Sequence, residues 1–233
     1  SQGLERPDPT AVWAPLGPLS DAAVQLADGG AMVIARGFDR NSRERAKTLR
    51  DALEHRGVAT IEVTQALGSE RLLADTKVAG VLNLVGSSTW QPHRLAAKLR
   101  VPMLTPYGTA GDSDSEYRRD VIGVATEQNR DIALSHVSVH PAGDAVSNLV
   151  ITCGGEPVSL PGGWIAITPE SDHLVVRFGG SDYAEQSLTA TEVRVESSEG
   201  PHRLVRDELP IADFESAVTF RAEPEGLQVI HTA

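Results

Sequence analysis

The chain has 233 residues, which is enough for one large domain or two small ones with an adequate core. Hydrophobic residues make up 40% of it and charged residues 23%, which is typical of a soluble globular protein and excludes a disordered one. The longest apolar runs are too short to cross a bilayer, and the first residues lack the pattern of a signal peptide. Because Cys153 is the only cysteine, an internal disulfide and a thiolate metal site are excluded, and we expect a cytoplasmic protein.

The net charge of −11 is unevenly distributed along the chain. Residues 1–130 contain 16 Lys and Arg and 16 Asp and Glu, whereas residues 131–233 contain 5 Arg, no Lys and 16 acids. This change predicts domains at 31–130 and 131–233, after a proline-rich leader segment at 1–30. Acidity keeps a protein soluble, and it also repels nucleic acid, which we therefore do not expect as a partner.

Short apolar runs alternate with helical patterns in the first domain. Strands are predicted at residues 31–35, 58–64, 79–85 and 101–105, and helices after residues 39–42, at 70–77 and at 91–100. Gly57 stands where the glycine after a helix belongs. This alternation predicts a parallel sheet covered by helices on both faces, whose ligands bind beyond the carboxyl ends of the strands.

The second domain changes to short strands separated by glycine-containing turns. The predicted strands are residues 132–140, 146–153, 164–168, 173–178, 188–196, 218–222 and 227–231. Regular spacing of this kind, without a long helical pattern, predicts an antiparallel β-sandwich. The expected fold class is therefore an N-terminal parallel α/β sheet domain followed by a C-terminal antiparallel β-sandwich domain.

Three of the predicted strand ends are followed by residues suited to binding an anion. The third strand leads into Gly86-Ser87-Ser88-Thr89, and the fourth into Pro106-Tyr107-Gly108-Thr109-Ala110-Gly111-Asp112. The first strand ends near Arg36 and Arg40, whose guanidinium groups can each hold a phosphate through two hydrogen bonds. Small residues let backbone N–H groups close on a phosphate. These segments predict an anion pocket at one sheet edge, although ordinary tight turns and solvated arginines explain them equally well.

Common catalytic motifs are missing from the sequence. There is no Gly-x-Ser-x-Gly elbow between a strand and a helix and no Gly-Lys-Ser/Thr triplet, and the seven histidines form no metal-ligand motif. We therefore expect no metal site. The acid pairs at Asp112 and Asp114 and at Asp207 and Glu208 are chemically able to assist Mg²⁺ or proton transfer, but such pairs are usually turn residues.

The order of these parts resembles the diacylglycerol kinase and lipid kinase superfamily, which is related to NAD kinases. Residues 85–89 fall on the hallmark Gly-Gly-Asp-Gly-Thr loop of that family, and residues 106–112 on its Pro-x-Gly-Thr-Gly-Asn-Asp loop. Residues 36–45 take the place of an Asn-Pro-x-Ser-Gly loop and a basic helix, without the Asn-Pro. Residues 206–210 are similar to its Asp-Gly-Glu segment. The resemblance covers about residues 30–233 and implies ATP or ADP as the ligand.

The differences from the family imply a loss of catalysis. In the resembling enzymes the Asp of the hallmark loop serves phosphoryl transfer, whereas Ser87 stands there and Ser88 replaces the next glycine. A neutral hydroxyl does not hold Mg²⁺ as a carboxylate does. The resemblance therefore implies a pseudokinase with a binding or regulatory role. Its nucleotide-binding residues would be Arg36, Arg40, Gly86, Ser87, Ser88, Thr89, Gly108 and Thr109.

Two alternatives stay open. The chain is either an atypical ATP- and Mg²⁺-dependent kinase of a lipid or small alcohol, in which Asp112 or Glu208 replaces the missing carboxylate, or an interaction module. In the interaction module, the acidic β domain binds a basic protein partner. Exposed edge strands in that domain would also permit a homodimer.

Overall fold

The computed structural model describes residues 15–65, 73–85, 89–106, 116–214 and 216–232. Residues 119–226 form one compact unit, called here the β unit, and the described residues on either side of it in the chain form the α/β unit. The division into domains at 1–30, 31–130 and 131–233 stays a prediction, which limited proteolysis would test.

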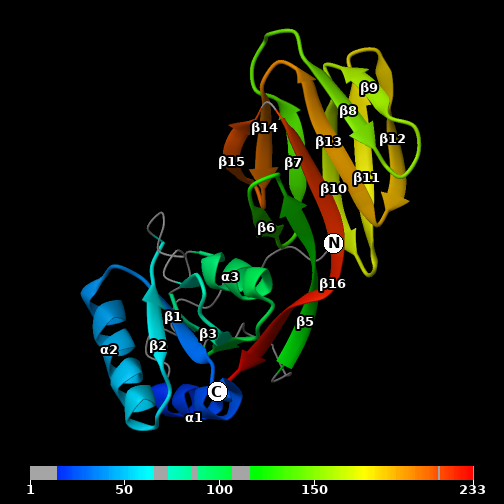
Figure 1. The fold of residues 1–233 in the computed structure, drawn as a ribbon. Helices are drawn as coiled ribbons and strands as arrows, with labels where there is room; N and C mark the ends of the chain where they lie inside the picture. The colour runs from blue at the N-terminus through cyan, green and yellow to red at the C-terminus, as the bar shows by residue number, and fades with distance from the viewer. Residues whose placement is uncertain (1–14, 66–72, 86–88, 107–115, 215, 233) are drawn as a thin grey trace. The chain divides into compact units, whose positions relative to one another are not determined.

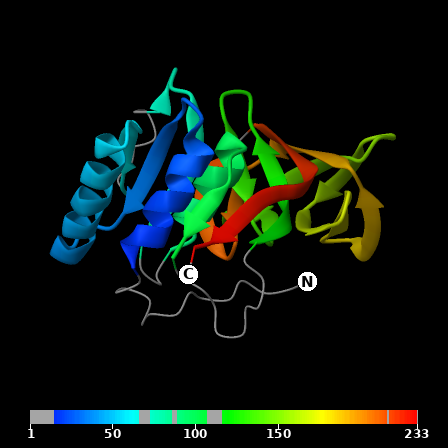
Figure 2. The same ribbon diagram turned by 90° about the horizontal axis from the view of Figure 1, so that it is seen from below.

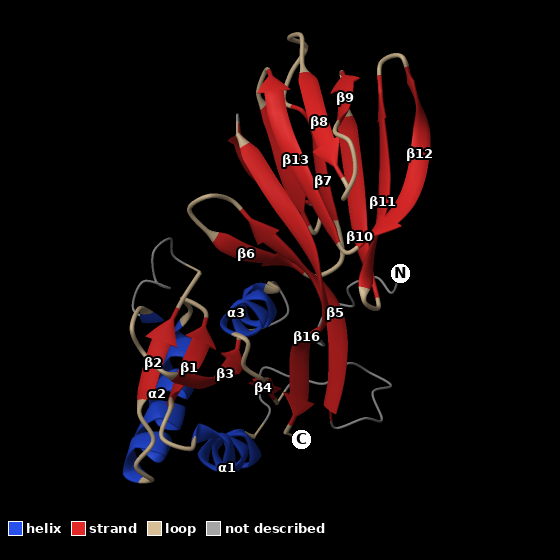
Figure 3. Ribbon diagram, turned by 45° about the vertical axis from the view of Figure 1, so that its right-hand side comes forward, coloured by secondary structure: helices blue, strands red, loops and turns tan. Residues whose placement is uncertain are grey.

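The α/β unit contains a parallel sheet in the order β2-β1-β3-β4; Figure 1 labels the first three strands and Figure 3 all four. The last residues of β16 lie parallel to β4 and extend this sheet. Helices α1 and α2 pack on one face and α3 contacts β3 and β4 (Figure 3), so the predicted parallel sheet is confirmed. The elements are α1 (Leu16–Ala27), β1 (Ala31–Arg36), α2 (Arg40–His55), β2 (Thr60–Val63), β3 (Val78–Leu84), α3 (Gln91–Leu99) and β4 (Met103–Thr105).

The spacing of apolar residues explains the helices of this unit. In α2, Ala46, Leu49 and Leu53 recur at helical spacing and are fully buried against the sheet. Gly57 follows the helix with φ +78°, as its position predicted. Helix α1 lies beside α2 (Figure 2) and was not predicted, because its segment was interpreted as a surface leader. The predicted helix at 70–77 is wrong for residues 74–77, of which 74 and 75 form a turn and 76 and 77 lie in an irregular segment.

The β unit consists of two antiparallel sheets that share one core. One sheet has the order β12-β11-β10-β7-β14-β15; the other contains β9, β8, β13 and the first part of β16, with β5 and β6 attached. Apolar residues from both sheets, such as Ile165 and Phe220, are fully buried together, so the predicted sandwich is confirmed. The strands are β5 (Glu116–Ala125), β6 (Arg130–Ala133), β7 (Val137–Pro141), β8 (Asn148–Thr152), β9 (Val158–Pro161), β10 (Trp164–Glu170), β11 (His173–Gly180), β12 (Tyr183–Ala190), β13 (Glu192–Glu199), β14 (His202–Arg206), β15 (Leu209–Phe214) and β16 (Ala217–His231).

Several strand predictions in this region differ from the structure. The single strand predicted at 132–140 is two strands, β6 and β7, and the one predicted at 188–196 is divided between β12 and β13. The two strands predicted at 218–222 and 227–231 are parts of β16, and β5, β9, β14 and β15 were not predicted. None of the described helices is long and apolar enough to span a membrane.

One histidine is fully buried in the β unit. The Oγ of Ser197 lies 2.6 Å from the carbonyl oxygen of Gly200 and 2.7 Å from Nδ1 of His202. Because the hydroxyl has one proton and donates it to the carbonyl, Nδ1–H of the imidazole donates to Oγ. Nε2 is then an unprotonated acceptor with no hydrogen-bond partner among the described residues. Burial, with His140 nearby, lowers the pKa of His202, so the ring is neutral at pH 7.

Candidate anion-binding edge of the parallel sheet

The register of the parallel strands brings their carboxyl ends together. Ala35 of β1 pairs with Asn83 of β3, and Thr105 of β4 pairs with His231 of β16. The pairing of β3 with β4 sets Asn83 beside Thr105. These four residues therefore form a row across the sheet at the edge where ligands of parallel sheets bind. The chain segments that follow β3 and β4 start next to each other at this row.

Most of the predicted ligand residues belong to those segments. Gly86, Ser87, Ser88, Gly108, Thr109 and Asp112 lie outside the described residues. The strands that lead into both segments are neighbours, and Thr89, the first described residue after the gap at 86–88, is also in the α/β unit. The structure thus places the approach to both loops at one edge, and the role of the loop residues remains a prediction.

Arg36 lies at the end of β1 and is mostly buried, with 19% of its side chain exposed. Its Nη1 donates to the carbonyl oxygen of Gly37 at 3.0 Å, and its Nε lies 3.8 Å from a carboxylate oxygen of Glu62 on β2. Arg50 of α2 shares the same carboxylate at 3.6 Å. These contacts hold the guanidinium of Arg36 at the sheet edge, where Arg36 and Arg50 share the carboxylate of Glu62 and Arg50 also pairs with Asp51 at 3.8 Å.

The N-terminus of α2 already holds a carboxylate of this chain. Asp39 precedes the helix, and its Oδ2 accepts a hydrogen bond from the backbone N–H of Ser42 at 2.9 Å. That bond lowers the pKa of Asp39. Oγ of Ser42 in turn accepts from the N–H of Gly37 at 3.3 Å. The first turn of α2 therefore has its own anion, which occupies the place that a phosphate would take at a bare helix N-terminus.

Arg40, in the first turn of α2, is one of the most exposed charged groups described. Its side chain is 86% exposed, and its Nε pairs with Glu44 one turn further along the helix at 2.9 Å. An exposed pair of this kind contributes little to stability. Arg40 is thus free to rearrange, whereas Arg36 is fixed by its contacts.

The start of α3 is fixed by two further polar contacts. Oγ1 of Thr89 accepts from the backbone N–H of Gln91 at 3.2 Å, and Nε2 of Gln91 donates to the carbonyl oxygen of Thr64, just after β2, at 3.0 Å. Trp90 packs edge-on against the ring of His93, which is 5% exposed. The hydroxyl of Thr89 is therefore engaged by its own backbone, and the end of β2 is tied to the same edge.

Sequence reasoning missed the buried polar residues of this edge. Asn83 is 3% exposed and Thr105 is 2% exposed, in strands that are otherwise apolar. Because a polar side chain in such a strand requires hydrogen-bond partners, an asparagine within Val81–Val85 was the signal that could have been used.

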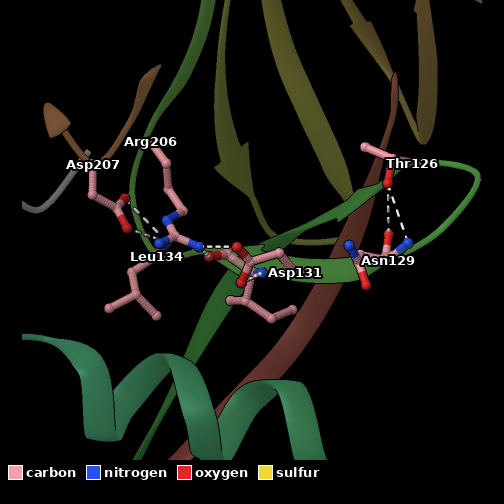
Figure 4. A network of polar contacts seen from close by, with 7 residues as sticks. Thr126, Asn129, Asp131, Leu134, Arg206 and Asp207 are labelled. Carbon is pink, nitrogen blue, oxygen red and sulfur yellow. Dashed lines mark hydrogen bonds and ion pairs between the residues drawn. The ribbon is translucent and has the colours of Figure 1, made fainter. Parts of the chain in front are cut away.

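Glu208, the other candidate acid, lies in the β unit, in the two-residue turn between β14 and β15. Asp207 and Glu208 both have positive φ, +49° and +70°, which is the turn geometry favoured in β-hairpins. Glu208 is exposed, whereas Asp207 is 9% exposed, and its carboxylate accepts from the backbone of Leu134 (Figure 4). Arg206 forms an ion pair with Asp131 beside it. Within the part of the chain that the structure describes, no group of three His, Cys, Asp or Glu side chains is arranged to hold a metal ion.

Comparison with known proteins gives likenesses of fold. Neither a protein-family model nor a curated protein sequence matches the chain. Among solved structures, a diacylglycerol kinase from Bacillus anthracis str. Sterne is similar over 87% of this chain and 96% of its own, with a TM-score of 0.46 and 10% identity. The yeast NADH kinase complexed with NADH is similar over 88% of this chain and 84% of its own, with a TM-score of 0.48 and 11% identity.

A third structure, an NAD kinase from Archaeoglobus fulgidus in complex with ATP, is similar over 87% of this chain and 93% of its own, with a TM-score of 0.44 and 12% identity. These proteins belong to the two groups of kinases that the sequence motifs resemble. At identities this low, the likeness concerns the fold alone.

Proposed function

We propose that this chain binds a phosphate-bearing nucleotide, ATP or ADP, at the carboxyl edge of the parallel sheet and does not transfer the phosphoryl group. The observation that carries the proposal is the register of β3 and β4, which starts the two small-residue loops from adjacent strands. A phosphate between the loops would receive backbone N–H groups from both. The binding or regulatory role belongs to the cytoplasm, where the lone Cys153 stays reduced.

Arg36 and Arg40 are the charged groups of this edge that would contact an anion. Arg36 is held there by Gly37 and Glu62, and a nucleotide phosphate would compete with Glu62 for the guanidinium of Arg36, whereas Arg50 also pairs with Asp51. Arg40 is exposed and free to turn toward the ligand. Because the α2 N-terminus carries Asp39, we expect the phosphates to lie toward β3 and β4 rather than on the first turn of α2.

The absence of transfer follows from the residue types in the first loop. Phosphoryl transfer needs a divalent cation that neutralises the phosphates, and carboxylates are the side chains that hold it. Ser87 stands at the position that corresponds to the family's Asp, and Ser88 adds a side chain where the family has glycine. Both changes leave a loop that can contact a phosphate but has no group to hold Mg²⁺ in place.

The test is calorimetric titration of the full chain with ADP and with Mg-ATP. We expect both ligands to bind, and the affinity for ADP to be unaffected by Mg²⁺. Arg36→Gln is expected to weaken ADP binding about fivefold to tenfold, because it removes a charge-assisted contact. Arg56→Gln is the matched control, since Arg56 stands at the other end of α2 and pairs with Asp21. No binding at millimolar ligand would overturn the proposal.

An assay with radiolabelled ATP and a panel of lipids and small alcohols separates this proposal from the atypical kinase. We expect no transfer. Transfer that depends on Mg²⁺ and disappears in Asp112→Ala or Glu208→Ala would identify a working kinase instead. Of the two acids in the turn between β14 and β15, Glu208 is the more accessible, because the carboxylate of Asp207 is buried and accepts a hydrogen bond from the backbone N–H of Leu134.

The interaction module is favoured by one specific observation. Residues 119–226 contain 18 acids and 7 arginines, so the β unit carries the whole net charge of the chain. Such a surface attracts a basic protein. Its edge strand β15 exposes Leu209 and Ile211, which a partner or a second copy would cover. A pull-down that is insensitive to Arg36→Gln but is lost on charge reversal in the β unit would support this second function.

A further inference from the structure

Asn83 is an unusual residue for the place where it lies. It stands in β3, whose five residues from Gly80 to Leu84 are all buried, and it is itself 3% exposed. Burying an amide lowers the stability of the folded state unless its oxygen and nitrogen both form hydrogen bonds, whereas a leucine at this position would carry no such penalty. Both amide atoms are in fact bonded, and both bonds involve the residues at which the two neighbouring strands end.

The oxygen of the amide defines where β3 ends. Oδ1 of Asn83 accepts from the backbone N–H of Val85 at 3.1 Å. A side chain that binds the N–H two residues further on forms a local turn and takes that N–H away from the neighbouring strand. The chain therefore leaves the sheet at Val85, directly before residue 86.

The nitrogen of the amide joins this point to the end of β4. Nδ2 of Asn83 donates to Oγ1 of Thr105 at 3.4 Å. Thr105 is the last residue of β4, and its carbonyl oxygen accepts from the N–H of Thr232 at 3.0 Å and from Oγ1 of Thr232 at 3.4 Å. One buried amide thus spans the two strand ends, and Thr105 is anchored on its other side by the chain that follows β16.

We propose that Asn83 and Thr105 are positioning residues for the proposed nucleotide site, which fix the distance between the starts of the segments that follow β3 and β4. This inference rests on the proposed function. Neither residue touches the ligand. Their link sets where the backbone N–H groups of the two loops begin, and a phosphate held between two loops is sensitive to that separation because hydrogen bonds weaken steeply with distance and angle.

The test compares two variants that each remove one buried hydroxyl. Thr105→Val removes the partner of the Asn83 amide, whereas Thr232→Val removes a hydroxyl that binds only the far side of Thr105. Loss of an oriented hydrogen bond predicts that Thr105→Val weakens ADP binding about tenfold, with Thr232→Val within about twofold of the wild type. Thr105→Ser keeps the hydroxyl and is expected to restore wild-type affinity. Equal affinities for ADP in both valine variants would overturn the positioning role.

A second measurement needs no ligand and so separates this inference from the proposed function. Hydrogen exchange of the Val85 amide, followed by NMR, reports the turn formed by Asn83. We expect exchange about tenfold faster in Thr105→Val, because the amide loses the bond that holds its orientation, and no change in Thr232→Val. If the wild type does not bind ADP but Val85 exchanges as expected, the proposed function fails and the link between the strand ends stands. Unchanged exchange in Thr105→Val would refute the link itself.

Discussion

Asp207 is the residue whose removal should disturb the β unit most clearly. Its carboxylate accepts from the backbone N–H groups of Leu134, Ser135 and His136 at 3.0, 2.8 and 3.2 Å and from the hydroxyl of Ser135 at 3.1 Å. With 9% of its surface exposed, it is screened from water. The same bonds separate β6 from β7, because they engage the N–H groups of the residues between the two strands.

The expected loss can be worked out from these contacts. A buried donor without a partner costs about 1–3 kcal/mol, and water entering the space left by the side chain will satisfy part of the three groups, so we expect Asp207→Ala to lower the free energy of unfolding by about 3–5 kcal/mol. Alanine at φ +49° adds about 1 kcal/mol of backbone strain. Asp207→Asn keeps one acceptor oxygen and tolerates positive φ, so its loss should be about 1–2 kcal/mol.

Glu208→Ala is the matched control for this experiment. Glu208 has φ +70° in the same turn but is exposed, so its replacement carries the backbone strain without the lost hydrogen bonds. Urea unfolding of the full chain, followed by far-UV circular dichroism and by tryptophan fluorescence, gives the free energies to compare. A difference below about 1 kcal/mol between the two alanine variants would refute the assignment of Asp207 as the acceptor for the N–H groups of Leu134, Ser135 and His136.

Three further changes follow from the structure. Because the pKa of His202 is lowered in the folded state, the unfolded chain takes up a proton first as the pH falls. The free energy of unfolding should therefore be constant above about pH 6.5 and should decrease below it, by up to about 1.4 kcal/mol per pH unit. This slope should be smaller in His202→Leu. In urea unfolding, Gly200→Ala should lower the free energy of unfolding more than Gly154→Ala does. Both glycines have positive φ, but a Cβ at residue 200 would lie 2.7 Å from the carbonyl oxygen of Val146. A Cβ at residue 154 would meet open space, so Gly154→Ala should lower the free energy of unfolding by only about 1 kcal/mol. Asp39→Ala should lower the free energy of unfolding by about 1 kcal/mol through loss of the helix cap, and Asp39→Asn by less than half of that; equal losses would contradict the cap.

Hydrophobic spacing was sufficient to predict the core of the α/β unit. Buried strands that alternate with amphipathic helices form a parallel sheet whatever the identity of the apolar residues. Their hydrophobic spacing also marks where each element lies, so β1, α2 and α3 were predicted close to their bounds. Helix α1 was not predicted because Pro15, Gly17 and Pro18 indicate an irregular segment. The helix is stabilised by the burial of Leu19 and Ala23, which depends on tertiary packing.

The β unit was predicted as a class but not strand by strand. A turn between β14 and β15 was missed because Asp207 and Glu208, rather than glycine, adopt positive φ there, which requires the bonds that Asp207 makes with distant residues. The strand β16 continues past Pro224 because Oδ1 of Asp120 accepts the N–H of Glu225, which has φ +51°. Such long-range contacts leave no local signal in the sequence.

The candidate site was predictable as far as its strands and loop composition. Parallel topology alone places the ends of β3 and β4 at one edge. The contribution of Asn83 was not predicted, because its partner Thr105 is 22 residues away and the bond depends on register. Residues 39–42 were predicted to precede α2, but it was not predicted that Asp39 takes the place of a phosphate there, since a capping residue and a competitor for phosphate look the same in a sequence.

A crystal structure of the chain grown with ADP and Mg²⁺ tests the account most directly. The account predicts that the phosphates of ADP lie beyond the ends of β3 and β4, in contact with the residues that follow Val85 and Pro106, and that no carboxylate of the chain holds a metal ion there. Nucleotide bound at another place, or a magnesium ion held next to Ser87 in a geometry fit for phosphoryl transfer, would contradict it.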